Sequence, residues 1–180
     1  MAKPSPHKKV KLIVCNAHAN AEKDKELIKE TLSFGAQKGL SANEIIFTSL
    51  ESPPAWELGV SKEVVSQLFQ LSNLFIFPSI SENCSLVLLE AMLSKNLLVL
   101  NDSVVPMREF GKENALYFKF GGLDEQVNYD DKGKFCEDVA KIINAEMSTN
   151  KALKASTDLK KNFNYETVFT NQIEPLFYGN

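Results

Sequence analysis

The sequence predicts an α/β protein built on a doubly wound parallel sheet. Short apolar runs rich in β-branched residues alternate along the chain with longer amphipathic segments. Most of these short runs are apolar at nearly every position, which is typical of parallel strands that helices cover on both faces. A sheet of this kind binds ligands at the carboxyl ends of its strands, so the loops at those ends are the places to search for function.

The first third of the chain predicts two strands separated by a helix. Residues 10–15 (VKLIVC) predict a buried strand, and residues 44–48 (EIIFT) predict a second one. Between them, residues 21–38 place apolar side chains among Glu and Lys at helical spacing, and Gly39 predicts the end of this helix. Three Pro and Gly residues within 51–60 then predict a loop.

The middle of the chain predicts a second helix and three further strands. Ser61 is the expected N-cap of a helix whose apolar face is formed by Val64, Val65, Leu68 and Phe69. Further along, a strand is expected at 73–77, an apolar helix at 86–95, and strands at 97–100 and 115–120.

The last third predicts helices, and the chain as a whole predicts one domain. A helix is expected at 135–145, and one or two more at 150–178, with Asn164 as a candidate cap. The 180 residues are 44% hydrophobic, which suffices for one core but not for two full-sized ones. We therefore expect an N-terminal tail over 1–9 and a single domain over 10–180.

Charge and hydropathy exclude several classes of protein. Charged residues make up 24% of the chain and the net charge is −3, so neither a disordered chain nor a polybasic nucleic-acid binder fits. No apolar stretch reaches the roughly 18–20 residues of a membrane-spanning helix. Residues 1–9 are basic, but no apolar run with a small-residue cleavage site follows, so a signal peptide is not expected.

The cysteines predict reduced thiols. Cys15, Cys84 and Cys136 are widely spaced and form no zinc-binding pattern with His7 or His18. Free thiols are typical of the cytoplasm. We therefore expect a cytoplasmic protein, and contact with a membrane surface stays open.

The segment with the most specific pattern is residues 77–92 (FPSISENCSLVLLEAM). Glu82 lies in the loop after a predicted strand, and Glu90 lies about one turn inside the next helix, leaning toward its N-terminus. The N–H groups of that N-terminus favour a phosphate. Two carboxylates beside a phosphate site can accept hydrogen bonds from hydroxyl groups, and a nucleotide sugar offers this combination of groups.

The pattern E-x7-E, preceded by a strand and Pro-Ser and followed by Ala-Met, resembles the donor-binding motif of retaining GT-B glycosyltransferases of the family 4 type. Residues 104–110 (VVPMREF) and 163–166 (FNYE) resemble flanking segments of that family and follow in the same order. The resemblance implies a Rossmann-like sheet that forms one half of a GT-B fold.

The resemblance also implies roles for individual residues. Glu82 would contact the donor-sugar hydroxyls and is the candidate catalytic residue, whereas Glu90 would bind the nucleotide ribose. Such enzymes resemble metal-independent transferases, so no metal and no cofactor are expected. The remaining donor-binding positions, where backbone N–H groups would hold sugar and diphosphate, are Asn83, Cys84, Ser85, Leu86 and Val87.

The chain departs from the family pattern in three places. Asn83 and Ser85 replace two loop glycines; Asn tolerates left-handed φ, and the Ser hydroxyl could donate to a phosphate or narrow the pocket. The turn at 16–20 (NAHAN) replaces a Gly-rich turn. The basic residues that pair with the diphosphate, and the acceptor domain, are expected to lie outside this chain, in a partner or a missing segment that would complete the cleft.

Several other residues have two interpretations each. His18 could line the site or lie in a solvated turn, and Trp56 could stack on a base or sugar or pack within its loop. Arg108 and Glu109 could contact the donor or form surface ion pairs. Cys84 as a nucleophile would need an adjacent base, and none is present in the sequence around it.

The leading hypothesis is a glycosyltransferase domain that binds a nucleotide-diphospho-sugar donor for retaining transfer to an unknown acceptor, inactive as an isolated chain. The alternative is a non-catalytic Rossmann-like binding or assembly module derived from a glycosyltransferase. A third hypothesis is another doubly wound protein, such as an epimerase or a response-regulator-like domain. Asp102 follows a strand as a phosphorylatable aspartate would, but no second acid stands beside it.

Overall fold

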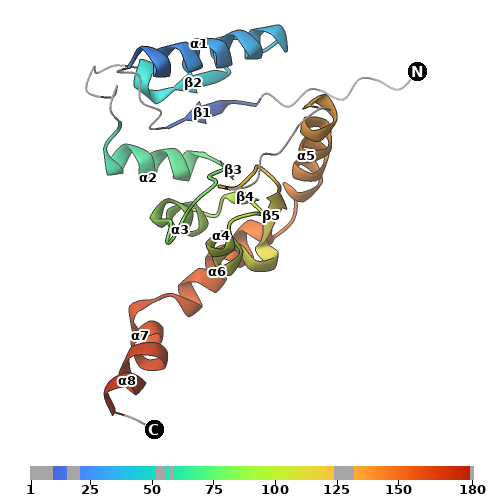
Figure 1. Ribbon diagram of the computed structural model, residues 1–180. Helices are drawn as coiled ribbons and strands as arrows, with labels where there is room; N and C mark the ends of the chain where they lie inside the picture. The colour runs from blue at the N-terminus through green and yellow to red at the C-terminus, as the bar shows by residue number, and fades with distance from the viewer. Residues whose placement is uncertain (1–9, 16–20, 52–55, 57–58, 124–131, 179–180) are drawn as a thin grey trace. The chain divides into compact units, whose positions relative to one another are not determined.

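The computed structural model describes residues 10–15, 21–51, 56, 59–123 and 132–178 (Figure 1). Strands and helices alternate, and strand pairing is parallel throughout the described residues, so the predicted α/β class is confirmed. The described strands form a two-stranded sheet and a three-stranded sheet. Contacts group the chain into two compact units, Met1–Val65 and Ser66–Asn180. The single domain over 10–180 stays a prediction.

The sheet of the first unit consists of β1 (Leu12–Val14) and β2 (Ile45–Phe47), with Leu12 opposite Ile45. α1 (Glu22–Gln37) is the crossover between these parallel strands. Both predicted strands are confirmed in position, but the expected burial of the first is wrong, because Leu12 is 44% exposed. The physical reason is that α1 packs mainly on β2: the buried core consists of Ile28 of α1 with Ile45 and Phe47 of β2, whereas Val14 of β1 is only partly buried against it.

The core of the first unit forms where α1 packs on β2. Ile28 of α1 is buried together with Ile45 and Phe47. Gly35 permits this close packing, because a Cβ atom at its position would overlap the Ile45 side chain. The helix ends as predicted at Gly39, whose φ of 85° suits glycine.

The sheet of the second unit has the order β3-β4-β5, formed by Leu74–Phe77, Leu97–Asn101 and Ala115–Phe118. All three strands are parallel. The central strand β4 is buried at all five positions, which confirms the interpretation of its apolar sequence as a covered parallel strand.

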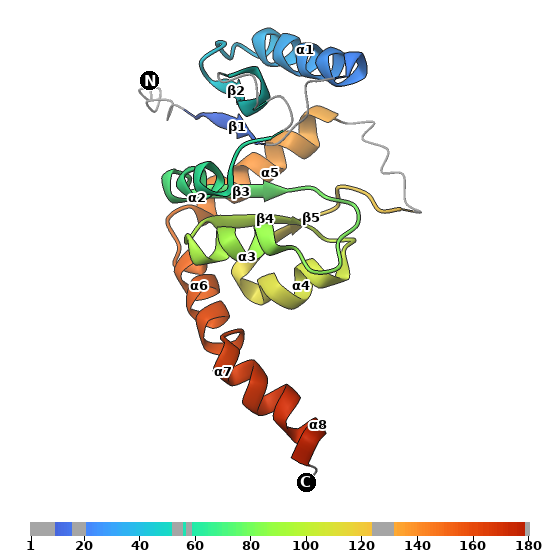
Figure 2. The ribbon, with the colours of Figure 1, turned by 90° about the vertical axis from the view of Figure 1, so that its left-hand side faces the viewer.

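Helices lie on both faces of this three-stranded sheet (Figure 2). Leu97 and Val99 pack on one face against Ile143 of α5 (Lys132–Glu146). The other face is covered by α3 (Leu86–Leu93), α4 (Val105–Gly111) and α6 (Lys151–Asn162). The helix α4 has no counterpart among the predicted elements.

Two helices are held by predicted caps. α2 (Lys62–Leu71) contains the boundary between the units, and its N-cap is confirmed because Ser61 Oγ accepts a hydrogen bond from the Val64 N–H at 3.5 Å. Asn164 Oδ1 accepts from the Thr167 N–H at 2.9 Å at the start of α7 (Tyr165–Val168), which confirms the second cap.

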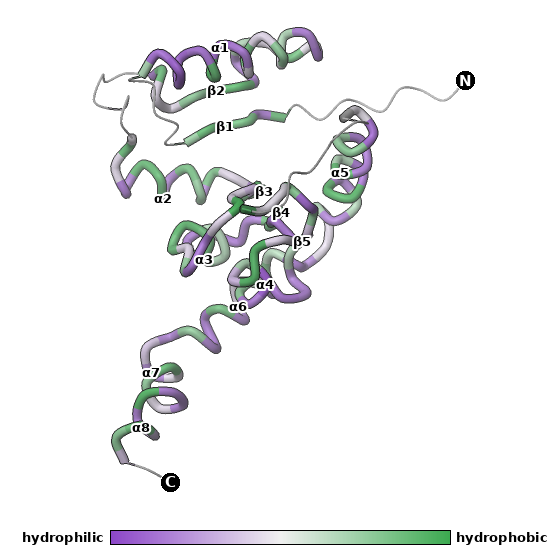
Figure 3. The backbone as a smooth tube through the Cα atoms, viewed as in Figure 1, coloured by the Kyte–Doolittle hydropathy of each residue, from purple (hydrophilic) through white to green (hydrophobic). Residues whose placement is uncertain are grey.

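The last helices extend away from the sheet of the second unit (Figures 1 and 2). A π-helical stretch (Phe169–Ile173) joins α7 to α8 (Glu174–Tyr178). Hydrophobic residues recur along these segments (Figure 3), and Leu176 and Tyr178 are more than three-quarters exposed. Among the described residues, no helix combines the length and the apolar character that crossing a membrane requires.

Candidate ligand site at the carboxyl edge of the three-stranded sheet

The candidate site is a strand–loop–helix unit formed by β3, the loop over 78–85 and α3. Because β3, β4 and β5 are parallel, the loops after them, at 78–85, 102–104 and 119–123, begin at the same edge of the sheet. We call this the carboxyl edge. The segment with the most specific sequence pattern therefore lies where an α/β sheet most often binds a ligand.

Ser85 forms the N-cap of α3. Its side chain is buried, its backbone is extended, and its Oγ accepts a hydrogen bond from the Leu88 N–H at 3.4 Å. The N–H groups of Leu86 and Val87 occupy the first two helical positions, which have no acceptor inside the helix. The first turn of α3 therefore keeps donors for an anion, but Ser85 already contacts one donor of this turn.

The two glutamates take the positions expected from the sequence. Glu82 is half-buried in the loop before α3, and Glu90 is exposed in the second turn of α3. Neither carboxylate forms an ion pair with a described residue. Both are therefore able to accept hydrogen bonds from hydroxyl groups, and their roles toward a donor stay predictions.

Asn83 and Ser85, at the two loop positions where the resembled family pattern has glycine, cause no backbone strain. Asn83 and Ser85 both have negative φ; Lys95 and Lys112 are the non-glycine residues with positive φ in the described part of the chain. The loop thus does not use the conformational freedom of glycine at either position. What the replacements add is side-chain volume, since Asn83 is exposed and the Ser85 hydroxyl lies against the helix terminus.

The other predicted donor-binding positions present mostly exposed side chains. Leu86 is 69% exposed and Val87 38%, and Cys84 is exposed with a free thiol. α3 is anchored instead by Leu88 and Ala91, which are fully buried. The helix is therefore fixed to the core by its inner face, while its first two residues are open to solvent at the carboxyl edge.

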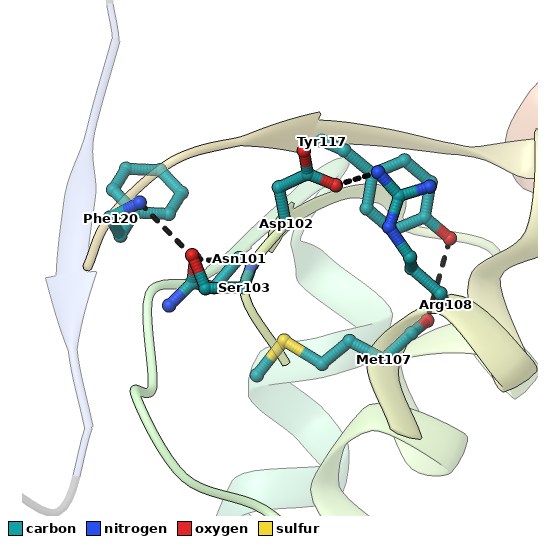
Figure 4. A network of polar contacts seen from close by, with 7 residues as sticks. All are labelled: Asn101, Asp102, Ser103, Met107, Arg108, Tyr117 and Phe120. Atoms are coloured by element: carbon teal, nitrogen blue, oxygen red, sulfur yellow. Dashed lines mark hydrogen bonds and ion pairs between the residues drawn. The ribbon is translucent and has the colours of Figure 1, made fainter. Parts of the chain in front are cut away.

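The residue that organises the carboxyl edge is Asn101, the last residue of β4. It is fully buried, and its Nδ2 donates to the carbonyl oxygens of Ser79 at 3.0 Å and Gly121 at 2.6 Å. Its Oδ1 accepts from the N–H groups of Ser103 at 3.1 Å and Phe120 at 3.2 Å (Figure 4). Asn101 was not among the residues predicted for the site, although a polar residue at the end of an apolar strand is a signal in the sequence that could have indicated it.

Arg108 forms structural contacts rather than standing free for a ligand. Its guanidinium pairs with Asp102 and lies 4.9 Å from the ring centroid of Tyr117 (Figure 4). The Tyr117 hydroxyl donates to the Met107 carbonyl at 3.4 Å, and burial raises the pKa of Tyr117 to about 12. Of the two interpretations open for Arg108, the ion pair is present in the structure, while Glu109 is exposed on α4.

The three cysteines and Trp56 are further candidates from the sequence that the structure describes. Cys15, Cys84 and Cys136 are free cysteines in the structure, and burial raises the pKa of the Cys15 thiol. Trp56 is half-buried, and His18 lies outside the described residues. In the described part of the chain, no group of three or more His, Cys, Asp and Glu side chains could hold a metal ion.

Comparisons with protein-family models, with curated proteins and with solved structures found no match for this chain.

Proposed function

We propose that this chain binds a nucleotide-diphospho-sugar at the carboxyl edge and supplies it for retaining sugar transfer, as the donor half of a GT-B glycosyltransferase with a Rossmann-like sheet. The observation that carries the proposal is the position of residues 77–92. These residues span the end of a parallel strand, a loop and a capped helix N-terminus, and their E-x7-E pattern places Glu82 in the loop and Glu90 in the helix. Ligand sites in α/β sheets are typically built from these parts.

The diphosphate is placed at the first turn of α3. The N–H groups of Leu86 and Val87 and the positive end of the helix dipole attract its charge there. A hydroxyl group carries one donor and two acceptor lone pairs. Ser85 can therefore keep accepting from the Leu88 N–H while it donates its own proton to a phosphate oxygen.

The carboxylates are placed on the hydroxyl groups of the ligand. Glu82 accepts from the donor sugar and Glu90 from the ribose, because neither is attracted to the like charge of the phosphates. During transfer the leaving diphosphate gains charge, and the fixed dipoles at the start of α3 stabilise it. Arg108 is not available as a cation for the diphosphate, since it pairs with Asp102. A second domain or partner chain supplies the acceptor site and the missing cations.

The free thiols at Cys15, Cys84 and Cys136 support a cytoplasmic location for this activity. If the acceptor is a lipid, the enzyme would also contact the membrane surface. We propose this second location only for a lipid acceptor.

Isothermal titration calorimetry with UDP-, GDP- and ADP-sugars tests the proposal. We expect one nucleotide to bind and the Glu90→Gln variant to weaken its binding about tenfold, because the glutamine oxygen lacks the charge that strengthens a hydrogen bond from a hydroxyl. Glu137→Gln is the matched control, an exposed glutamate on α5. Absence of heat with every donor, at protein concentrations that detect millimolar affinity, would contradict donor binding.

A second candidate function is a non-catalytic binding or assembly module. One observation favours it: Ser85 Oγ already accepts the hydrogen bond of the Leu88 N–H, which is then not free for a ligand. The resembled family has glycine at this position, which has no side chain to form that bond. This candidate predicts no donor binding by the wild-type chain. The Ser85→Gly and Asn83→Gly substitutions, which restore both glycines, separate the two functions if they create donor binding that the wild type lacks.

A further inference from the structure

Asn101 joins the loops that follow all three strands of the second unit. Its carboxamide contacts Ser79 after β3, Ser103 after β4, and Phe120 and Gly121 after β5. A carboxamide has two N–H donors and an oxygen with two lone pairs. Both donors and both acceptor sites form hydrogen bonds with main-chain groups of the carboxyl edge. The side chain is completely buried.

The contact with Ser79 lies at the start of the candidate donor loop. The Ser79 carbonyl accepts from Asn101 Nδ2, and the Ser79 hydroxyl donates to the Ser81 carbonyl at 3.1 Å. These two hydrogen bonds therefore connect Asn101, through Ser79, to Ser81, the residue directly before Glu82. A loop held at this end and by the N-cap of α3 at the other end has few ways to move.

We propose that Asn101 is a positioning residue, which fixes the loop over 78–85 to the loops over 102–104 and 119–123 so that the carboxyl edge is preformed for its ligand. The part of this statement that concerns a nucleotide-sugar ligand rests on the proposed function. The coupling of the loops does not, because it follows from the hydrogen bonds of Asn101 alone.

The chemistry of the side chain makes this role specific to asparagine. Aspartate has the same shape and keeps an acceptor for Ser103 and Phe120, but its ionised form has no donor for Ser79 and Gly121. Two carbonyl oxygens would then face a carboxylate, which repels them. Buried acceptors that lose their donor are costly, so the loops after β3 and β5 should separate from β4.

The chain contains a matched control at the other end of the same strand. Asn96 directly precedes β4, is also fully buried, and its Nδ2 donates to the carbonyl oxygens of Phe69 at 2.9 Å and Ala91 at 3.4 Å. The Asn96→Asp substitution removes the same two donors from a buried site. It leaves the hydrogen bonds of the carboxyl edge unchanged. Comparing the two variants therefore distinguishes a general loss of stability from a displacement of the edge loops alone.

Hydrogen–deuterium exchange of the free protein, read by mass spectrometry, tests the coupling. In Asn101→Asp we expect exchange over 78–85 and over 119–123 to accelerate together by about tenfold or more, because two hydrogen bonds that close the edge are lost. In Asn96→Asp these segments should exchange as in the wild type, and the residues around Phe69 and Ala91 should accelerate instead. Unchanged exchange of either loop in Asn101→Asp, or the same pattern in both variants, would overturn the coupling.

The milder Asn101→Ser substitution serves if the aspartate variant does not fold. Its hydroxyl is too short to reach every partner but places no charge against the carbonyl groups. It should accelerate exchange in the same two loops, by a smaller factor than Asn101→Asp. Acceleration spread evenly over the second unit would count against a positioning role.

Calorimetry with the donor that the wild type binds tests the consequence for the ligand. Asn101→Asp should weaken binding about tenfold or more, while Asn96→Asp should bind as the wild type does at a temperature where both are folded. Equal affinity of Asn101→Asp and wild type would overturn the positioning of the ligand site. If the wild type binds no donor, the proposed function fails, and the exchange experiment still decides whether Asn101 couples the loops.

Discussion

The guanidinium carbon of Arg108 lies 4.9 Å from the centroid of the Tyr117 ring, so the cation stacks on the phenol while it pairs with Asp102. This stack connects α4 to β5 directly below the carboxyl edge. Burial is the main reason that the pKa of Tyr117 rises to about 12; nearby Asp102 and Glu113 raise it further, and the charge of Arg108 opposes the shift.

Tyr117 should make the unfolding free energy fall with pH between about 10 and 12. The folded state holds the phenol proton up to about pH 12, whereas an unfolded tyrosine releases it near pH 10. The stabilisation is therefore complete below pH 10 and is lost as the pH rises through the folded pKa. Urea unfolding at a series of alkaline pH values measures this slope.

The Tyr117→Phe variant provides the control for this dependence. It keeps the ring below Arg108 and removes the titrating hydroxyl. The variant should lose the part of the alkaline slope that Tyr117 contributes, and ultraviolet titration should lose one tyrosine that ionises with a raised pKa. An unchanged slope in the variant would show that another group is responsible.

Lys95→Gly should raise the unfolding free energy by about 0.5–1 kcal/mol. Lys95 has a φ of 61° in the turn that ends α3, where its N–H donates to the Met92 carbonyl and the Asn96 N–H donates to the Ala91 carbonyl. This pattern is a Schellman motif, which favours glycine at the left-handed position. Urea unfolding measures the change, and Lys95→Ala, which keeps the strained φ, should bring no such gain.

Gly111→Ala should lower the unfolding free energy by about 1–3 kcal/mol because it overpacks the contact between α4 and the sheet. A Cβ atom at Gly111 would lie 2.5 Å from Tyr117 Oη and 2.9 Å from Leu100 Cδ1. Gly133→Ala is the matched control, since its Cβ would meet no atom within 4 Å and alanine is the better helix former. Equal thermal midpoints for the two variants would contradict the packing of α4 described above.

Ser85→Ala should lower the unfolding free energy by about 1 kcal/mol through the loss of the N-cap of α3. Ser85→Thr keeps a hydroxyl acceptor and should retain most of the stability. Denaturant unfolding of the three proteins at one pH gives the comparison. If alanine and threonine have the same effect, the hydrogen bond to the Leu88 N–H contributes no stability.

Local chemistry in the sequence predicted most of the strands and the ends of several helices. Gly39, Ser61 and Asn164 each act through atoms within a few residues, so their roles as caps could be predicted without tertiary structure. The apolar run of β4 likewise predicted its own burial. Each of these features depends on a short segment alone.

The features that the sequence analysis missed depend on partners far along the chain. Asn101 contacts Ser79, 22 residues earlier, and Gly121, 20 residues later, and no local pattern connects these positions. The helix α4 was missed because Pro106 was not recognised as a residue of a first helical turn, where proline is tolerated. The burial of β1 was overestimated because an apolar strand sequence does not reveal which strand the neighbouring helix covers, and the buried core of α1 forms with β2.

The register of the three-stranded sheet has a consequence for the order of folding. Leu97 pairs with Leu74, 23 positions earlier, and Ala115 pairs with Leu98, 17 positions earlier. Pairing β4 with either neighbouring strand therefore closes only a short loop of chain. Short closures cost little chain entropy and favour rapid pairing. We therefore expect residues 74–118 to hold the folding nucleus of the second unit. A conservative truncation such as Val99→Ala should slow refolding, whereas Leu176→Ala in exposed α8 should leave the refolding rate unchanged.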